Sequence, residues 1–122
     1  MPASLSFLVI DSMDPEELVP FWCGLLGREV DYRLADGQFI ELSPTKDGLT
    51  VGFQRVTEAK SVKNRLHLDL VVEDLDEATA EIEALGGTWL EPGNTRDLES
   101  WRWRCMADPE GNEFDIVVLP PS

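Results

Sequence analysis

The sequence predicts an α+β fold made of two tandem βαβββ modules. The chief observation is an internal similarity between residues 5–27 and residues 66–86. Each segment opens with a strand-like apolar run, continues through an acidic helix start into an amphipathic helix, and ends at a Leu-Gly pair. Three strand-like segments separated by turn residues follow each helix. We therefore expect a single domain over residues 1–122, with module 1 at about 4–56, a linker at 57–64 and module 2 at about 65–119.

In module 1, the first strand leads into a helix with recognisable ends. Asp14 is a potential N-cap with Glu17 three residues later, and Pro15 suits the first helical position. Gly27 is a natural C-terminal stop. The apolar residues between follow a helical spacing: Leu18, Phe21, Trp22, Leu25 and Leu26. Pro20 conflicts with this helix, because an interior proline costs on the order of 3 kcal/mol; the helix is bent, or its regular part starts later.

The remaining elements are bounded by turn-forming residues. Module 1 continues with strands at 29–34, 38–43 and 49–56, separated by turns at 36–37 and 44–48. Module 2 opens with a strand at 65–72 and a helix that Asp74 and Glu77 cap and Gly86 ends. The stripe of this helix consists of Leu75, Ala78, Ile82 and Leu85. Strands at 88–91, 100–107 and 113–119 follow, separated by a polar loop at 92–99 and a turn at 108–112.

Alternation along three strands separates a face covered by the helix from an open face. The helix-covered face takes mainly apolar residues: Leu8 and Ile10, then Leu66, Leu68, Leu70 and Val72, then Phe114, Ile116 and Val118. The open face takes Phe7, Val9 and Asp11, then Arg65, His67, Asp69 and Val71, then Glu113, Asp115 and Val117. The side chains with chemical potential therefore gather on the open face.

Charge and composition exclude several classes of partner. The chain has 24 Asp+Glu against 10 Lys+Arg and a net charge of −14. Nucleic acid is excluded because phosphates need a basic face, and docking on an anionic membrane is disfavoured for the same reason. No apolar run approaches the ~20 residues of a membrane span, and no signal peptide is recognisable. Cys23 and Cys105 do not form a disulfide framework, so we expect reduced core residues of a cytoplasmic protein.

With these modules the chain resembles the vicinal oxygen chelate superfamily, which includes glyoxalase I, extradiol dioxygenases, fosfomycin resistance proteins and bleomycin-binding proteins. The resemblance covers nearly the whole chain and is most specific at residues 64–70 and 108–114, which look like the glyoxalase-like subgroup. It implies that curved mixed sheets form a cup around a small-molecule site, and that the protein is a homodimer. Enzyme members hold one divalent metal there, with ligands from the first and last strand of each module.

Carrying the ligand pattern of the family onto this chain gives three usable positions of four. The first position falls on Phe7, which cannot bind a metal. The others fall on or near Gln54, on His67 and on Asp115, where glutamate is usual. These three are the candidate metal ligands, with water completing the coordination. Each has another interpretation: Gln54 is a plain polar strand residue, His67 lines a pocket without metal, and Asp115 acts as a base or pairs with Arg65 or another cation.

Further candidates lie on the same strands. Asp69 shares the face of His67 and would orient the imidazole or act as a general base, so Asp69 and Asp115 are the candidate catalytic residues. Trp101 and Trp103 alternate with two arginines. One interpretation is an aromatic wall for a ligand. The favoured one is cross-strand packing of the tryptophans with the arginines outside.

Two functions fit these residues. The first is a divalent-metal-dependent lyase, isomerase or oxygenase acting on vicinal oxygens. The second is a metal-free protein that binds or sequesters a cationic or aromatic drug-like molecule, as the bleomycin-binding proteins do. In that case Phe7, Arg65, His67, Trp101 and Trp103 line the pocket, and Asp69 and Asp115 match a positive charge. The missing donor at Phe7 and the acidic composition favour the second function, whereas His67 favours the first.

Overall fold

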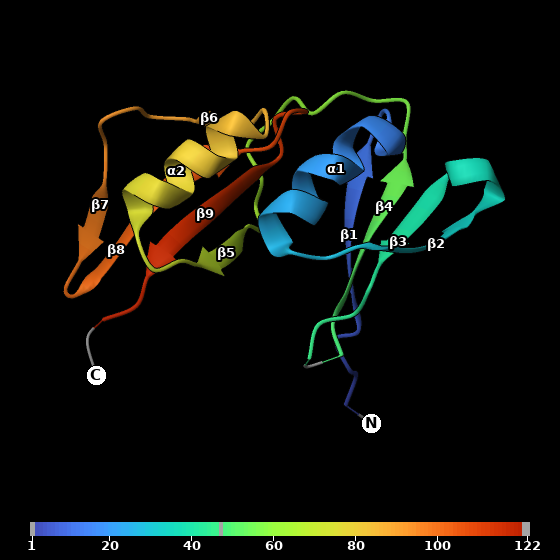
Figure 1. The fold of residues 1–122 in the computed structure, drawn as a ribbon, viewed down its shortest axis with the longest axis horizontal. Helices are drawn as coiled ribbons and strands as arrows, with labels where there is room; N and C mark the ends of the chain where they lie inside the picture. Colours follow the sequence, from blue (N-terminus) through green and yellow to red (C-terminus); the bar gives the residue numbers. More distant parts are fainter. Residues whose placement is uncertain (1, 47, 121–122) are drawn as a thin grey trace. The chain divides into compact units, whose positions relative to one another are not determined.

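The computed structural model describes residues 2–46 and 48–120. They form two compact units, Met1–Ala59 and Lys60–Ser122. In each unit one α-helix packs on a mixed sheet (Figure 1), so the predicted α+β class with two tandem modules is confirmed. Neither helix of the described residues is long and apolar enough to cross a membrane.

The first unit contains β1 (Phe7–Ser12), α1 (Pro15–Leu26), β2 (Val30–Leu34), the 3₁₀ turn η1 (Ala35–Gly37), β3 (Phe39–Leu42) and β4 (Thr50–Arg55). The sheet order is β1-β4-β3-β2, with β1 and β4 parallel and the other pairs antiparallel. Leu18 and Trp22 of α1 are buried, as are Ile40 and Phe53 on the strands beneath. Each predicted strand lies within a few residues of its observed bounds. Within the predicted turn at 44–48, Asp47 lies outside the described residues.

The helix α1 begins at Pro15 and runs through Pro20, so the alternative of a later start is wrong. The expected cap by the Asp14 carboxylate is also wrong, because the Asp14 side chain makes no capping hydrogen bond. The backbone carbonyl of Asp14 already accepts from the N–H of Glu17 at 3.1 Å. The predicted stop is confirmed: Gly27 adopts φ 64°, a conformation that glycine reaches without strain.

The second unit contains β5 (Leu68–Val71), α2 (Leu75–Ala84), β6 (Thr88–Trp89), β7 (Arg96–Leu98), β8 (Trp101–Ala107) and β9 (Glu113–Val118). The strand order is β5-β9-β8-β6, and β7 also pairs with β8. The strands β5 and β9 are parallel. The strand β7 lies inside the segment 92–99, for which the sequence predicted a loop. The chain reverses after it with Glu99 at φ 56°, which lets Arg96–Leu98 pair back onto β8. The Asp74 carboxylate caps α2 as predicted, accepting from the N–H of Glu77.

The start of β5 differs from the prediction. The strand begins at Leu68, and Leu66, which was expected under the helix, is 90% exposed. The preceding residues are held elsewhere, because the Glu113 carboxylate accepts from the backbone N–H of Asn64 at 2.7 Å and lies 3.4 Å from the Lys63 ammonium. Glu113 therefore fixes the segment before β5 to the start of β9.

The run Trp-Arg-Trp-Arg on β8 also differs from the favoured interpretation, in which both arginines lay outside. Arg104 is only 8% exposed and lies against α2, whereas Arg102 is exposed beside Asp97. The Arg104 guanidinium donates to the Leu75 carbonyl and to the hydroxyls of Thr79 and Thr95, forms an ion pair with Asp76, and lies 4.2 Å over the Trp89 ring. An arginine is tolerated there because its donors find acceptors. This guanidinium ties α2 to the sheet.

Candidate metal centre

Three side chains with metal-binding atoms meet on the open face of the second sheet. Strands β5 and β9 are parallel neighbours, and Asp69 lies directly opposite Asp115. The residues that flank Asp115, Phe114 and Ile116, are buried on the side of α2. Because successive side chains of a strand alternate, both aspartates point to the other face. His67 precedes Asp69 by two residues and reaches the same face, as the alternation predicted.

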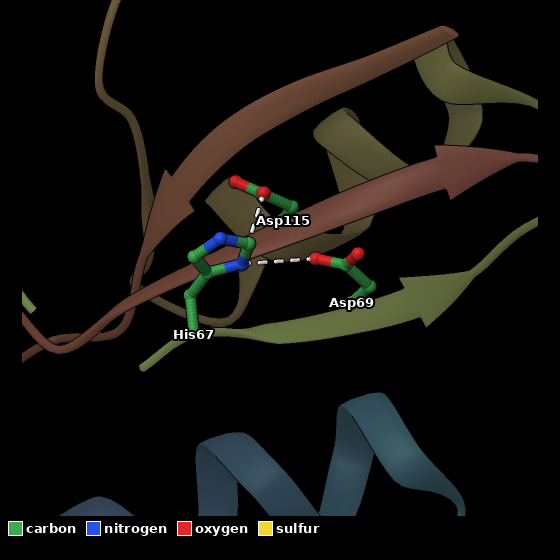
Figure 2. Close-up of side chains that lie close together, drawn as sticks. All are labelled: His67, Asp69 and Asp115. Atoms are coloured by element: carbon green, nitrogen blue, oxygen red, sulfur yellow. Dashed lines mark hydrogen bonds and ion pairs between the residues drawn. The ribbon is translucent and has the colours of Figure 1, made fainter. Parts of the chain in front are cut away.

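The histidine lies between the two carboxylates (Figure 2). Its Nδ1 atom is 3.1 Å from Oδ1 of Asp69 and 3.3 Å from Oδ2 of Asp115. One potential ligand atom from each residue lies within 4.8 Å of the others. The side chains of His67 and Asp69 are about half exposed, whereas that of Asp115 is 14% exposed. The cluster is thus open to solvent on one side and anchored in the sheet by Asp115.

The electrostatic surroundings of Asp115 oppose a bare negative charge. Burial raises the pKa of the Asp115 carboxyl, and the neighbouring Asp69 carboxylate acts in the same direction. A hydrogen bond with the Cys105 thiol and the proximity of His67 partly offset this increase in the pKa. Two carboxylates so close together are more stable with a cation between them than without one. A bound cation would therefore stabilise the ionised form of both carboxylates.

Cys105 belongs to this face, although the sequence predicted only a reduced core residue. It lies directly opposite Asp115 in the β8–β9 ladder and is unpaired. Burial, followed by its hydrogen bond with Asp115, raises the pKa of the thiol, so Cys105 is a neutral donor rather than a thiolate. Strand alternation could have shown that Cys105 shares a face with Trp101 and Trp103. That Cys105 lies next to Asp115 follows only from the register between β8 and β9.

The donor set fits a divalent metal. One imidazole nitrogen and two carboxylate oxygens are borderline and hard donors, which suit ions such as Mn²⁺, Fe²⁺, Ni²⁺ and Zn²⁺. Three protein ligands with an exposed side leave coordination positions for water or a bound molecule. Nδ1 of His67 faces both carboxylates, so this nitrogen and one oxygen of each aspartate would be the atoms that hold a metal. The sequence predicted His67, Gln54 and Asp115 as metal ligands, and Asp69 only as a residue that orients the imidazole or acts as a base. In the structure, Asp69 lies beside His67 and Asp115.

The tryptophans lie on the same face, farther along the sheet. Trp103 is half-buried and opposite Val117, one step along from the Cys105–Asp115 pair, and Trp101 is 42% exposed. Both tryptophans thus lie on the open face, as the interpretation of an aromatic wall for a ligand requires. Arg65 is exposed, and among the described residues it is in no ion pair with Asp115, whose ionic partner is His67. Roles for Trp101, Trp103 and Arg65 in ligand binding stay predictions.

Phe7 and Gln54 belong to the first unit. Phe7 is half exposed on β1 opposite Thr50, and Gln54 lies on β4 opposite Asp11. In the first sheet, the residue in the position of Asp115 is Gly52, since Gly52 pairs with Val9 as Asp115 pairs with Asp69. Gln54 is two residues farther along β4. Its role as a metal ligand and that of Phe7 in a ligand pocket stay predictions.

The sequence and the fold have known relatives. A sequence model that describes the glyoxalase-like domain matches residues 7–117. No curated protein matches the chain. One similar structure is a glyoxalase/bleomycin resistance protein/dioxygenase family enzyme from Burkholderia phytofirmans PsJN, with a TM-score of 0.75 at 20% identity over 95% of this chain and 98% of the other.

Two further structures share the fold. A genomically encoded fosfomycin resistance protein from Listeria monocytogenes has a TM-score of 0.76 at 19% identity, covering 98% of this chain and 95% of its own. A glyoxalase-related enzyme from Fulvimarina pelagi has a TM-score of 0.74 at 16% identity, covering 95% of this chain and 88% of its own. At these identities the likeness concerns the fold alone.

Proposed function

Because the chain belongs to the glyoxalase-like domain family of the vicinal oxygen chelate superfamily, we propose that it binds a divalent metal through His67, Asp69 and Asp115. The observation that carries this proposal is the convergence of one imidazole and two carboxylates, with one ligand atom of each within 4.8 Å of the others. When bound, the metal would supply Lewis-acid stabilisation to two neighbouring oxygens of a small molecule.

The residues of the cluster have distinct tasks under this proposal. Asp115, held by Cys105 and the surrounding sheet, fixes the position of the site. Asp69 is 56% exposed on its side chain, so its second oxygen remains accessible to a bound molecule and can accept a proton from it. The half-buried Trp103, which lies opposite Val117 on the same face, offers an apolar surface to the carbon skeleton of that molecule.

We further propose an enzyme of the lyase, isomerase or oxygenase type acting on vicinal oxygens. The open side of the cluster supports this, since a catalytic metal needs free coordination positions. The alternative is a metal-free binding protein for a cationic or aromatic molecule. It is supported by Phe7, which offers no donor, and by a net charge of −14. Metal binding separates the two functions.

The test is metal content and affinity of untagged protein. Elemental analysis of the purified protein, followed by titration with Mn²⁺, Fe²⁺, Ni²⁺ and Zn²⁺, should give one metal per chain. His67→Ala, Asp69→Asn and Asp115→Asn should each lower the affinity by at least about tenfold, the usual scale for loss of a ligand or its close partner. Co²⁺ absorption in the visible range reports directly on the ligand set.

Asp97→Asn is the matched control, because Asp97 is an exposed aspartate of the same unit that pairs with Arg102 on the other face of the sheet. It should bind metal like the wild type. Absence of stoichiometric metal in the wild type, or equal losses in Asp97→Asn and Asp115→Asn, would refute the metal centre. Binding of an aromatic or cationic molecule at Asp69 and Asp115 by the metal-free protein would then support the alternative.

We also propose that the protein is cytoplasmic and forms a homodimer. Two unpaired cysteines support a reducing compartment. The dimer rests on the resemblance to one-domain members of the superfamily. Light scattering coupled to size-exclusion chromatography would show a mass of one chain or of two.

A further inference from the structure

The first sheet has a position equivalent to the metal centre, but its residues are different. In the second sheet, Asp69, Asp115 and Cys105 form a row across three neighbouring strands. In the first sheet, the equivalent row is Val9, Gly52 and Glu41. Phe7 precedes Val9 by two residues, as His67 precedes Asp69. Phe7, Val9 and Gly52, the residues equivalent to His67, Asp69 and Asp115, thus have no metal-binding side-chain atom, and the carboxylate of this row lies one strand farther along, on β3.

Glu41 is nearly buried on the open face of the first sheet. Its neighbours along β3, Ile40 and Leu42, are buried on the side of α1, so alternation directs Glu41 to the opposite face. The residue is 7% exposed. Its partner in the ladder is Tyr32, and a hydrogen bond with Glu41 is the main reason why the pKa of the Tyr32 phenol is raised.

No positive charge accompanies this carboxylate in the part of the chain that the structure describes. Glu41 is in none of the ion pairs formed there. The arginines of the same sheet lie on the other face: Arg33 pairs with Ile40, and Arg55 follows the open-face residue Gln54. The hydrogen bond from the Tyr32 phenol leaves the negative charge of this nearly buried carboxylate uncompensated, so a cation from outside the chain would complement it.

Aromatic rings surround this carboxylate. The Phe39 ring lies directly over Gly52, because a Cβ placed on that glycine would be 2.7 Å from Cζ of the ring. Tyr32 is 45% exposed beside Glu41, and Phe7 and Val9 present further half-exposed apolar surface on β1. Aromatic faces attract organic cations, whose charge is spread over carbon-bound groups, more effectively than they replace the water around a small metal ion.

We propose that Glu41, together with the rings of Tyr32 and Phe39, binds an organic cation of the alkylammonium type on the open face of the first sheet. The carboxylate supplies the counter-charge, the tyrosine hydroxyl orients the carboxylate, and the glycine at position 52 leaves room for the phenylalanine ring to lie flat. This site uses no residue of the metal centre, so cation binding here and metal binding at His67, Asp69 and Asp115 are tested independently of each other.

The experiment compares two probes that differ in charge but hardly in shape, choline and 3,3-dimethylbutan-1-ol. Each is titrated into ¹⁵N-labelled wild-type protein and followed by amide chemical shifts. Choline should shift the amides of Tyr32, Glu41 and Gly52, and the neutral alcohol should bind at least about tenfold more weakly. Equal binding of the two probes, or choline shifts confined to Asp69 and Asp115, would overturn the proposal. This comparison needs no variant.

Two variants sharpen the test. Glu41→Gln removes the counter-charge and should weaken choline binding by about tenfold. Glu17→Gln makes the same change in net charge at an exposed position of α1 and should leave choline affinity unchanged. Unaltered affinity in Glu41→Gln, or equal losses in both variants, would show that the carboxylate does not bind the cation.

Discussion

Removal of Arg104 should destabilise the second unit far more than removal of its neighbour Arg102. The two arginines lie on the same strand, two residues apart and on the same face, but only Arg104 is covered by α2. Its guanidinium donates to Thr79 at 2.8 Å, to Thr95 at 2.9 Å and to the Leu75 carbonyl at 3.2 Å. Arg104→Ala removes these bonds together with the contact to the Trp89 ring.

The size of the effect follows from the individual contacts. A hydrogen bond from a charged donor contributes roughly 1.5–3 kcal/mol, but Thr79 keeps its own bond to the Leu75 carbonyl, so the losses do not add. The cation–π contact contributes about 1–2 kcal/mol when desolvated. The ion pair with Asp76 contributes at most about 1 kcal/mol, because the Asp76 side chain is 88% exposed. Together we expect a loss of about 3 kcal/mol in the free energy of unfolding.

This loss corresponds to a melting temperature lower by roughly 12 °C, at about 4 °C per kcal/mol for a domain of this size. Urea unfolding followed by tryptophan fluorescence measures it well, since three of the four tryptophans, Trp89, Trp101 and Trp103, lie in the second unit. Arg102→Ala is the matched control: its pair with Asp97 is exposed on both sides, so the loss should stay below about 1 kcal/mol. Equal losses in the two variants would refute the reasoning.

Three further predictions concern the helix starts, the sheet of the first unit and the response to acid. Asp74→Ala should lower the stability by about 1 kcal/mol and Asp14→Ala by less, since only the first carboxylate caps its helix; equal losses in thermal unfolding would contradict this. Gly52→Ala should cost roughly 1–3 kcal/mol because the new methyl group meets the Phe39 ring, and Phe39→Leu should restore part of the stability. The pKa of the Glu113 carboxyl lies below its usual value of 4.5, because the carboxylate accepts a hydrogen bond from the backbone N–H of Asn64 and, as a smaller effect, lies near the Lys63 ammonium. Its stabilising contribution is therefore complete above that value and is lost as the pH falls through the lower folded-state pKa; urea unfolding between neutral and acidic pH should show a smaller loss in Glu113→Gln than in the wild type.

The repeat and most elements could be predicted from the sequence, because local signals determine them. Alternation on β9 separated Phe114 and Ile116 from Asp115, and the Asp74 cap and the Gly27 stop follow from residue type alone. The failures depend on backbone conformation, which residue type does not fix. Whether Asp14 caps its helix depends on a competing backbone bond, and the strand β7 exists because Glu99 adopts a left-handed conformation that residue type does not favour.

The site was predicted in part for the same reason. His67 and Asp69 are close in the sequence, so alternation joins them, and Asp115 was placed by family resemblance. The contacts of Cys105 and Glu41 could not be predicted, because they depend on which residue of a neighbouring strand lies opposite. Arg104 escaped prediction because an alternating basic and aromatic run does not reveal how far the helix extends over the strand. The register between strands and the part of a strand that a helix covers are set only when the sheet assembles, so a single segment of sequence does not reveal them.

The pairing of β5 has a consequence for the synthesis of the chain. Within the described residues, β5 has a single ladder partner, β9, the last strand to be made. On the ribosome, His67 and Asp69 emerge well before Asp115, and at roughly 5–20 residues per second the delay lasts several seconds. During that interval the first unit can complete its own sheet, while β5 waits as an unpaired nascent strand. A chain whose synthesis stops before β9 would therefore have the strands of the first unit but would lack Asp115 and the ladder partner of β5.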